Sequence, residues 1–150
     1  MHLDHTNGLQ SLSLHNLAFT VSDLEKTIQW YGDTLGFEVL NRVSFAAIGA
    51  QVAFLQKADV RLEVLQAPGG FRISEMFADA PAHLLPIGNK VLVLQVNDLH
   101  TATLELEEKG VTFAWKEVDL TGDGIFSTMI RDSDGNFINI FQRAPAEKLA

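Results

Sequence analysis

The chain of 150 residues contains no cysteine. This absence excludes disulfide bonds, thiolate zinc sites, iron–sulfur clusters and a cysteine nucleophile. Basic residues are also scarce, since 11 lysines and arginines stand against 19 aspartates and glutamates, for a formal net charge of -8. Nucleic acids and anionic membranes attract positively charged surfaces, so we expect neither as a partner.

Long apolar runs are lacking as well. No stretch approaches the roughly 20 apolar residues of a membrane-spanning helix. The first residues, Met1–His5, lack the basic and apolar blocks of a secretory signal peptide. Hydrophobic residues make up 47% of the chain and charged residues 20%, an ordinary globular composition. We therefore expect one water-soluble domain located in the cytoplasm.

The second half of the sequence repeats the pattern of the first. Residues 17–24 read LAFTVSDL and residues 92–99 read LVLQVNDL. Both stretches alternate as strands do, and both end in an aspartate, Asp23 or Asp98, placed to cap the start of a helix. A helical pattern follows each stretch. Each pattern ends at a glycine typical of a helix C-cap, Gly36 and Gly110.

Three stretches with strand character follow each predicted helix. In the first half they are residues 37–45, 50–56 and 60–66, and in the second half 111–115, 125–131 and 137–141. Each half therefore predicts strand–helix–strand–strand–strand. We expect an α+β fold of two βαβββ modules, about residues 12–66 and about 89–142. A linker of about residues 67–88 joins them, with a helical turn around 74–77.

Several motifs carry a resemblance to a known family. They are the duplicated unit, the Val-Ser-Asp-Leu turn of residues 21–24, the stretch from Trp30 to Phe37, and the Asp-Ser-Asp-Gly-Asn turn of residues 132–136. Together they resemble the vicinal oxygen chelate superfamily, which includes glyoxalase I, extradiol dioxygenases, fosfomycin and bleomycin resistance proteins and methylmalonyl-CoA epimerase. The resemblance spans about residues 12–142. It implies curved sheets around a ligand trough and, because modules of the family commonly pair across subunits, a homodimer.

The resemblance also points to the positions that hold metal in the family's metalloenzymes. Each module supplies two ligands there, from its first and last strands, and the positions carry over to Asn16, Glu63, Val91 and Asn139. Valine has no lone pair to donate, and amide oxygens are weak ligands for transition metals. Because Glu63 is the one carboxylate of the set, we expect no resident metal and no cofactor.

His15 offers an alternative reading of the first strand. It lies one residue before the expected ligand position, and successive strand residues point to opposite faces. The face of Asn16, Ala18 and Thr20 is small and polar, which suits a trough, so His15 is expected on the other face as a structural histidine. A bulge at Asn16 would instead turn His15 inward beside Glu63.

The alternation of the four strands predicts which residues face the trough. The expected ligand-binding residues are Asn16, Thr20, Arg61, Glu63, Val91, Gln95, Phe137, Asn139 and Phe141. Apolar walls with a few polar groups suit a small organic molecule. Arg61 and Glu63 share one face, either as a pair that orients the ligand or as an ion pair that holds the strands in register.

Three functions are compatible with these residues. The first is metal-independent binding of a small organic molecule, as in the bleomycin resistance proteins of the resembled family. The second is a metal-free isomerase or lyase that uses Glu63 as a general base. The third is a metal-dependent lyase or dioxygenase with His15 and Glu63 as ligands. The sequence does not identify the substrate or ligand.

Overall fold

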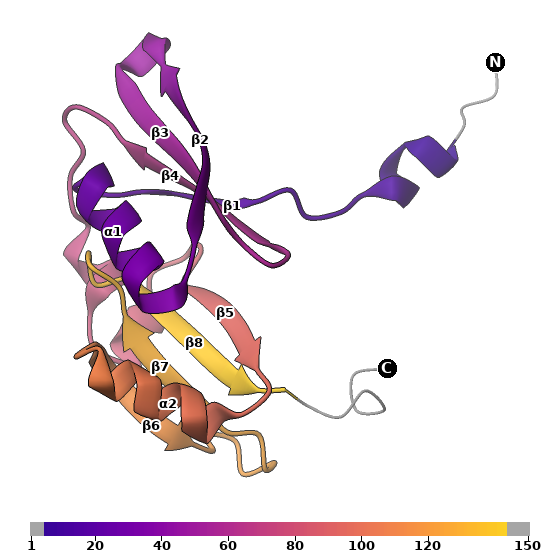
Figure 1. Cartoon of the computed structure of the whole chain (residues 1–150), viewed down its shortest axis with the longest axis vertical. Coiled ribbons are helices and arrows are strands. Elements are labelled where there is room, and N and C mark those ends of the chain that lie inside the picture. The colour runs from indigo at the N-terminus through magenta and orange to yellow at the C-terminus, as the bar shows by residue number, and fades with distance from the viewer. Residues whose placement is uncertain (1–4, 144–150) are drawn as a thin grey trace.

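The computed structural model describes residues 5–143 and builds them into two modules of the same design (Figure 1). Two short 3-10 helices, η1 (His5–Asn7) and η2 (Leu9–Ser11), precede the first module in an arm that projects away from it. Among the described residues, no helix is long and apolar enough to cross a membrane.

The first module is a helix packed on a four-stranded sheet. Its elements are β1 (Leu17–Thr20), α1 (Leu24–Leu35), β2 (Glu38–Phe45), the 3-10 helix η3 (Ala46–Ile48), β3 (Ala50–Lys57) and β4 (Val60–Gln66). The strand order is β1-β4-β3-β2, which we call sheet A. The edge strand β1 runs parallel to β4, and the other pairs are antiparallel.

The second module repeats this arrangement. Its elements are β5 (Val91–Val96), α2 (Leu99–Glu108), β6 (Thr112–Val118), β7 (Ser127–Arg131) and β8 (Phe137–Gln142). The order β5-β8-β7-β6 forms sheet B, with β5 parallel to β8. The linker contains two 3-10 helices, η4 (Ser74–Phe77) and η5 (Ala82–Leu84). The predicted α+β fold of two βαβββ modules is confirmed.

Matching capping interactions start both helices. The side chain of Asp23 accepts a hydrogen bond from the backbone N–H of Lys26, and that of Asp98 accepts one from Thr101, each at 3.0 Å. A glutamine at the end of each module's last strand satisfies a second free N–H. Gln66 Oε1 accepts from Leu24 at 2.7 Å, and Gln142 Oε1 accepts from Leu99 at 2.8 Å. The last strand of each module therefore fixes the start of its own helix.

The two helices end slightly differently. Gly36 is the C-cap of α1 and adopts the left-handed conformation, with a φ of 79°. The C-cap of α2 is Lys109, and Gly110, with a φ of 70°, is the residue after it. Glycine is favoured at both positions because left-handed backbone is strained for other residues.

One hydrophobic core lies on the helix side of both sheets. Leu62 and Val64 of sheet A and Ile130 and Ile138 of sheet B are completely buried within it. In β1, Leu17 and Phe19 pack against this core, while Ala18 and Thr20 are exposed on the opposite face. This alternation agrees with the expected register of the first strand. We call the surface of each sheet that faces away from its helix the open face.

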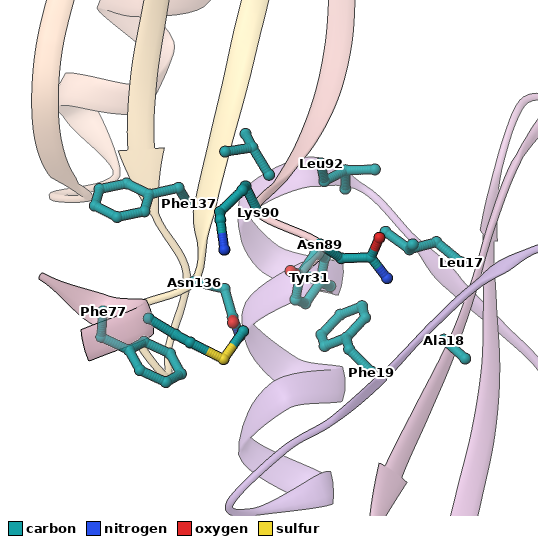
Figure 2. A pocket seen from close by; sticks show the side chains of 12 residues that line it. Leu17, Ala18, Phe19, Tyr31, Phe77, Asn89, Lys90, Leu92, Asn136 and Phe137 are labelled. Atoms are coloured by element: carbon teal, nitrogen blue, oxygen red, sulfur yellow. The ribbon is translucent and has the colours of Figure 1, made fainter. Parts of the chain in front are cut away.

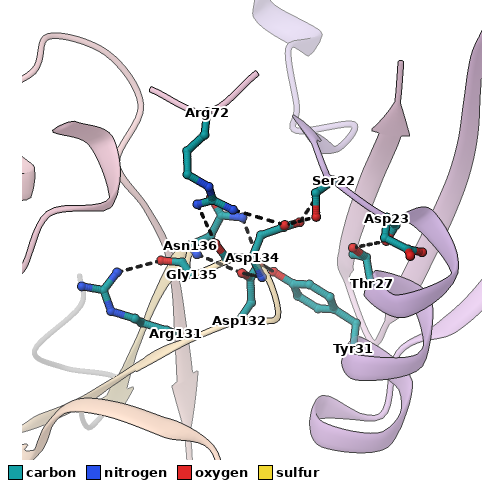
Figure 3. Close-up of polar contacts among 10 residues, drawn as sticks. All are labelled: Ser22, Asp23, Thr27, Tyr31, Arg72, Arg131, Asp132, Asp134, Gly135 and Asn136. Carbon is teal, nitrogen blue, oxygen red and sulfur yellow. Dashed lines mark hydrogen bonds and ion pairs between the residues drawn. The ribbon is translucent and has the colours of Figure 1, made fainter. Parts of the chain in front are cut away.

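A polar cluster at the 132–136 turn connects the modules (Figure 3). The Tyr31 hydroxyl of α1 donates to Asp132 Oδ2 at 2.8 Å, and both groups are buried. The backbone N–H and the hydroxyl of Ser22 donate to the carboxylate of Asp134. Arg72 of the linker donates to the Asp134 carbonyl at 2.8 Å. The turn thus joins the second module to the first module and to the linker.

Candidate functional site

The predicted site residues of the first module lie on the open face of sheet A. Glu63 pairs in register with Ala18, and Leu65 pairs with Thr20, so these side chains share that face. Glu63, Arg61 and Asn16 are half-buried and Thr20 is exposed. The structure therefore gathers the four predicted residues of this module on one surface.

Arg61 does not pair with Glu63. Among the described residues no ion pair joins the two, and the neighbour of Arg61 is the ring of His15, with 3.4 Å between Nη1 and Nε2. The amide of Asn16 lies 2.8 Å from the other ring nitrogen of His15. The Arg61 Nε atom is buried without a hydrogen-bond partner in the described part of the chain. The described residues therefore do not form the Arg61–Glu63 ion pair that was one of the two expected roles of these side chains.

The predicted residues of the second module lie on the open face of sheet B. Val93 pairs in register with Asn139, and Gln95 pairs with Phe141. Val93 is 57% exposed, whereas Met129, the neighbour of Asn139 on β7, is 1% exposed. The Oδ1 atom of Asn139 is buried and has no hydrogen-bond donor among residues 5–143. A buried amide oxygen without a donor is unfavourable, so a ligand that donates a hydrogen bond to this oxygen would be stabilised on this face.

The residues at the four chelating positions do not fit a divalent metal. Val91 carries no donor atom, and Asn16 and Asn139 offer only neutral amide groups beside the single carboxylate of Glu63. His15 lies against the Arg61 guanidinium, whose positive charge disfavours a cation at that ring. No group of three or more histidine, aspartate or glutamate side chains able to hold a metal occurs within the described residues.

A separate cavity lies at the seam between the modules (Figure 2). Its volume is about 260 Å³, and it opens between β1, α1, η4 and the start of β5. Val91 and Phe137 line it, but the other seven predicted ligand-binding residues do not. They are Asn16, Thr20, Arg61, Glu63, Gln95, Asn139 and Phe141.

The polar residues of the seam cavity were not anticipated from the sequence. Asn89, Lys90 and Asn136 line it together with Met76 and Phe77 of η4. Asn89 and Lys90 lie at the end of the linker, immediately before β5, where no periodic pattern marks them. His83 of η5, which lies within the expected linker, is 3% exposed and packs on Phe137 with 4.4 Å between ring centroids. Only the placement of the linker over the seam reveals these contacts.

The two tandem βαβββ modules define the fold class, and comparison with known sequences identifies the family of the chain. The sequence profile of the Glyoxalase/Bleomycin resistance protein/Dioxygenase superfamily matches residues 13–140. The chain belongs to this superfamily, and the resemblance drawn from its motifs is confirmed.

Two curated relatives share a name. Mitochondrial methylmalonyl-CoA epimerase of Bos taurus is 25% identical over 126 residues, which is 81% of this chain and 67% of the relative. The Homo sapiens protein of the same name is 25% identical over 116 residues, or 74% of this chain and 61% of the relative. The matches thus span about two thirds of these relatives' length.

A solved structure shows the same fold. The glyoxalase family protein from Enterococcus faecalis superposes with a TM-score of 0.74 and 21% sequence identity. The superposition covers 89% of this chain and 100% of that one. At this level of identity the likeness supports the architecture of the two modules and does not extend to a shared reaction.

Proposed function

We propose that the protein binds a small organic molecule on its open faces without the help of a metal. The observation that carries this proposal is the open face of sheet B, where the buried Asn139 Oδ1 lacks a donor beside the apolar side chains of Val93 and Met129. Burial of an apolar ligand body on this face, with one hydrogen bond to Asn139, satisfies both features.

A second candidate is a metal-free isomerase or lyase with Glu63 as the general base. It is favoured by the similarity to two proteins named methylmalonyl-CoA epimerase, because an epimerase is an isomerase. Glu63 is half-buried on the open face of sheet A and is not held in an ion pair among the described residues, so its carboxylate is available. The metal-dependent alternative with His15 and Glu63 gains no such support, because His15 is engaged with Arg61 and Asn16.

The binding proposal is tested with 2-naphthol, an apolar molecule with one hydroxyl donor. Calorimetry should show that the wild-type protein binds 2-naphthol and that Asn139→Leu weakens binding about tenfold, because one buried hydrogen bond is lost. Asn97→Leu, which changes an exposed asparagine in the turn between β5 and α2, is the matched control and should bind as the wild type does. Loss of binding after treatment with a metal chelator would contradict the proposal.

The variant Glu63→Gln distinguishes the isomerase alternative from binding without catalysis. If Glu63 is a base, the wild type catalyses exchange of deuterium from solvent into the carbon beside a thioester carbonyl, and Glu63→Gln abolishes this exchange while the thioester still binds. If the protein only binds, neither form catalyses exchange.

We also propose that the protein is a homodimer. The N-terminal arm projects from the modules (Figure 1). Its side chains Leu9, Leu12 and Leu14 are exposed, as are Phe45 and Val93 on the open faces. Apolar surface of this kind favours a partner that covers it. Light scattering should give about twice the chain mass of 16.5 kDa, and a value of 16.5 kDa at micromolar concentration would contradict the dimer.

The expected cytoplasmic location stays a prediction, testable by fractionation of the native cell.

A further inference from the structure

The seam cavity contains a buried cation that no other group of the described chain neutralises. The Nζ atom of Lys90 is inaccessible to solvent and has no hydrogen-bond partner among the described residues. Figure 2 shows its side chain extending into the cavity toward Asn136, with Phe137 on one side and Tyr31 on the other. An ammonium group without partners in such a place is unfavourable unless an anion joins it.

Three acidic side chains on and around the 132–136 turn already have partners. Asp132 accepts hydrogen bonds from the Tyr31 hydroxyl, the Asn136 amide and two backbone N–H groups. Asp79 pairs with Arg131 at 2.8 Å, and Asp134 pairs with Arg72 at 3.5 Å. Within residues 5–143, none of the three forms an ion pair with Lys90. The protein itself therefore leaves the charge of Lys90 for a ligand to neutralise.

Two further basic side chains, Arg131 and His83, pack on the Phe137 ring near Lys90. The Arg131 guanidinium stacks over the Phe137 ring at 4.1 Å from its centroid, and His83 packs on the same ring. Burial and the positive charges of Arg131 and Lys90 lower the pKa of His83. Because Arg131 is paired with Asp79 and Arg72 with Asp134, Lys90 is the cation of this region that lacks a partner within residues 5–143.

The rest of the cavity wall is apolar. Leu17 and Phe19 come from β1, Met76 and Phe77 from η4, and Leu92 from β5. The volume of about 260 Å³ is below the roughly 300–1,000 Å³ of pockets for drug-sized ligands, so the occupant is small. A single ammonium matches one carboxylate, whereas phosphate sites more often combine several donors such as arginine forks and backbone N–H groups.

We infer that the seam cavity is a second ligand site, which binds a small monocarboxylate with an apolar body. The carboxylate pairs with Lys90 beside Asn136, and the apolar body packs against Phe19, Met76 and Leu92. This site is separate from the open faces, because Glu63 and Asn139 do not line it.

The test uses phenylacetate, with phenylacetamide as its uncharged counterpart and inorganic phosphate as the anion without an apolar body. Calorimetry at fixed ionic strength should show phenylacetate binding to the wild type at least about tenfold more tightly than phenylacetamide, because the amide carbonyl can accept a hydrogen bond from Lys90 but has no negative charge to pair with it. Lys90→Met should remove this preference. Lys26→Met makes the same change of charge at an exposed lysine of α1 and should retain it.

Each other outcome contradicts the assignment. Equal affinity of the wild type for phenylacetate and phenylacetamide, or no binding of phenylacetate in the millimolar range, would overturn it without reliance on any variant. Retention of the preference in Lys90→Met would place the anion elsewhere, and phosphate binding as tight as that of phenylacetate would exclude a role for the apolar wall. Glu63→Gln and Asn139→Leu should leave phenylacetate binding unchanged, so failure of the open-face proposal and failure of this one give different results.

Discussion

At the scale of single residues, the contact between Tyr31 and Asp132 is the clearest link between the modules. Burial raises the pKa of Tyr31, and the nearby charge of Asp132 raises it further, so the phenol stays protonated and donates a hydrogen bond to the carboxylate. Burial also raises the pKa of Asp132, while the hydrogen bonds from Tyr31 and Asn136 act in the opposite direction. The carboxylate is tolerated at this depth because its oxygens are satisfied.

Removal of the Tyr31 hydroxyl should weaken the whole fold. Tyr31→Phe leaves a buried carboxylate one donor short, and a hydrogen bond to a charged group contributes about 1.5–3 kcal/mol. Urea unfolding should show a loss of this size. Ser133→Ala, which deletes an exposed hydroxyl in the same turn, should change stability by less than about 0.5 kcal/mol. An equal effect of the two substitutions would argue against the role given to Tyr31.

His83 should make the protein sensitive to mild acid. Because its pKa in the folded protein lies below the ordinary value of 6.5, the unfolded chain binds its proton first as the pH falls. The free energy of unfolding is then unaffected by His83 at neutral and higher pH, and it decreases as the pH drops through about 6.5 toward the lowered value. The decrease between about pH 7.5 and about pH 5.5 should be smaller in His83→Gln.

His100 provides a control of opposite sign. Its hydrogen bond to Glu117 raises the pKa of this exposed histidine, so His100 contributes stability at low pH that is lost as the pH rises. His100→Gln should therefore enlarge the decrease in acid. If both substitutions shift the pH dependence in the same direction, the assignment for His83 is wrong.

At the scale of elements, the sequence predicts the regular parts well. The two aspartate caps, the helices they start and the strand β4 lie where the alternation and capping patterns place them. These features depend on local chemistry, which a sequence displays directly. The second cap of each helix, from Gln66 and Gln142, was not predicted because it depends on the return of the last strand to the start of the helix.

The strand β6 shows where local patterns fail. It was predicted to end at Trp115 but continues to Val118, and β7 begins at Ser127 rather than two residues earlier. Its pairing with β7 is irregular on both sides of Trp115. Glu117 adopts a positive φ of 49°, held by a hydrogen bond from its N–H to Thr128 Oγ1. Such irregularities interrupt the alternation on which the prediction relied.

The aspartate caps should contribute measurably to stability. Asp98→Ala removes the acceptor of the Thr101 N–H and should lower the midpoint of thermal unfolding below that of the wild type. Asp98→Asn retains an acceptor and should lose much less stability than Asp98→Ala. Thermal unfolding measured by circular dichroism compares the two variants, and equal stability of Asp98→Ala and the wild type would show that Gln142 alone is a sufficient cap.

At the level of the whole molecule, one part of the site follows from the individual strands, and another follows from how the two modules are placed. Strand alternation correctly assigns Glu63 and Asn139 to faces opposite the helices, because alternation is a property of each strand. The seam cavity arises only where β1, β5 and the linker meet, and residues distant in sequence, such as Phe19, Met76 and Lys90, contribute to it. No pattern within one segment could have indicated that arrangement.

We propose that this member of the superfamily binds its ligand without a resident metal, and the metal content of the purified protein is the direct test of that proposal. Elemental analysis of wild-type protein purified without an affinity tag should find far less than one transition-metal ion per chain. The triple variant Asn16→His, Val91→His, Asn139→Glu supplies three strong donors beside Glu63 and, as a positive control, should gain zinc affinity. About one bound metal ion per wild-type chain would refute metal-independent binding and would indicate that His15 and Glu63 hold the ion.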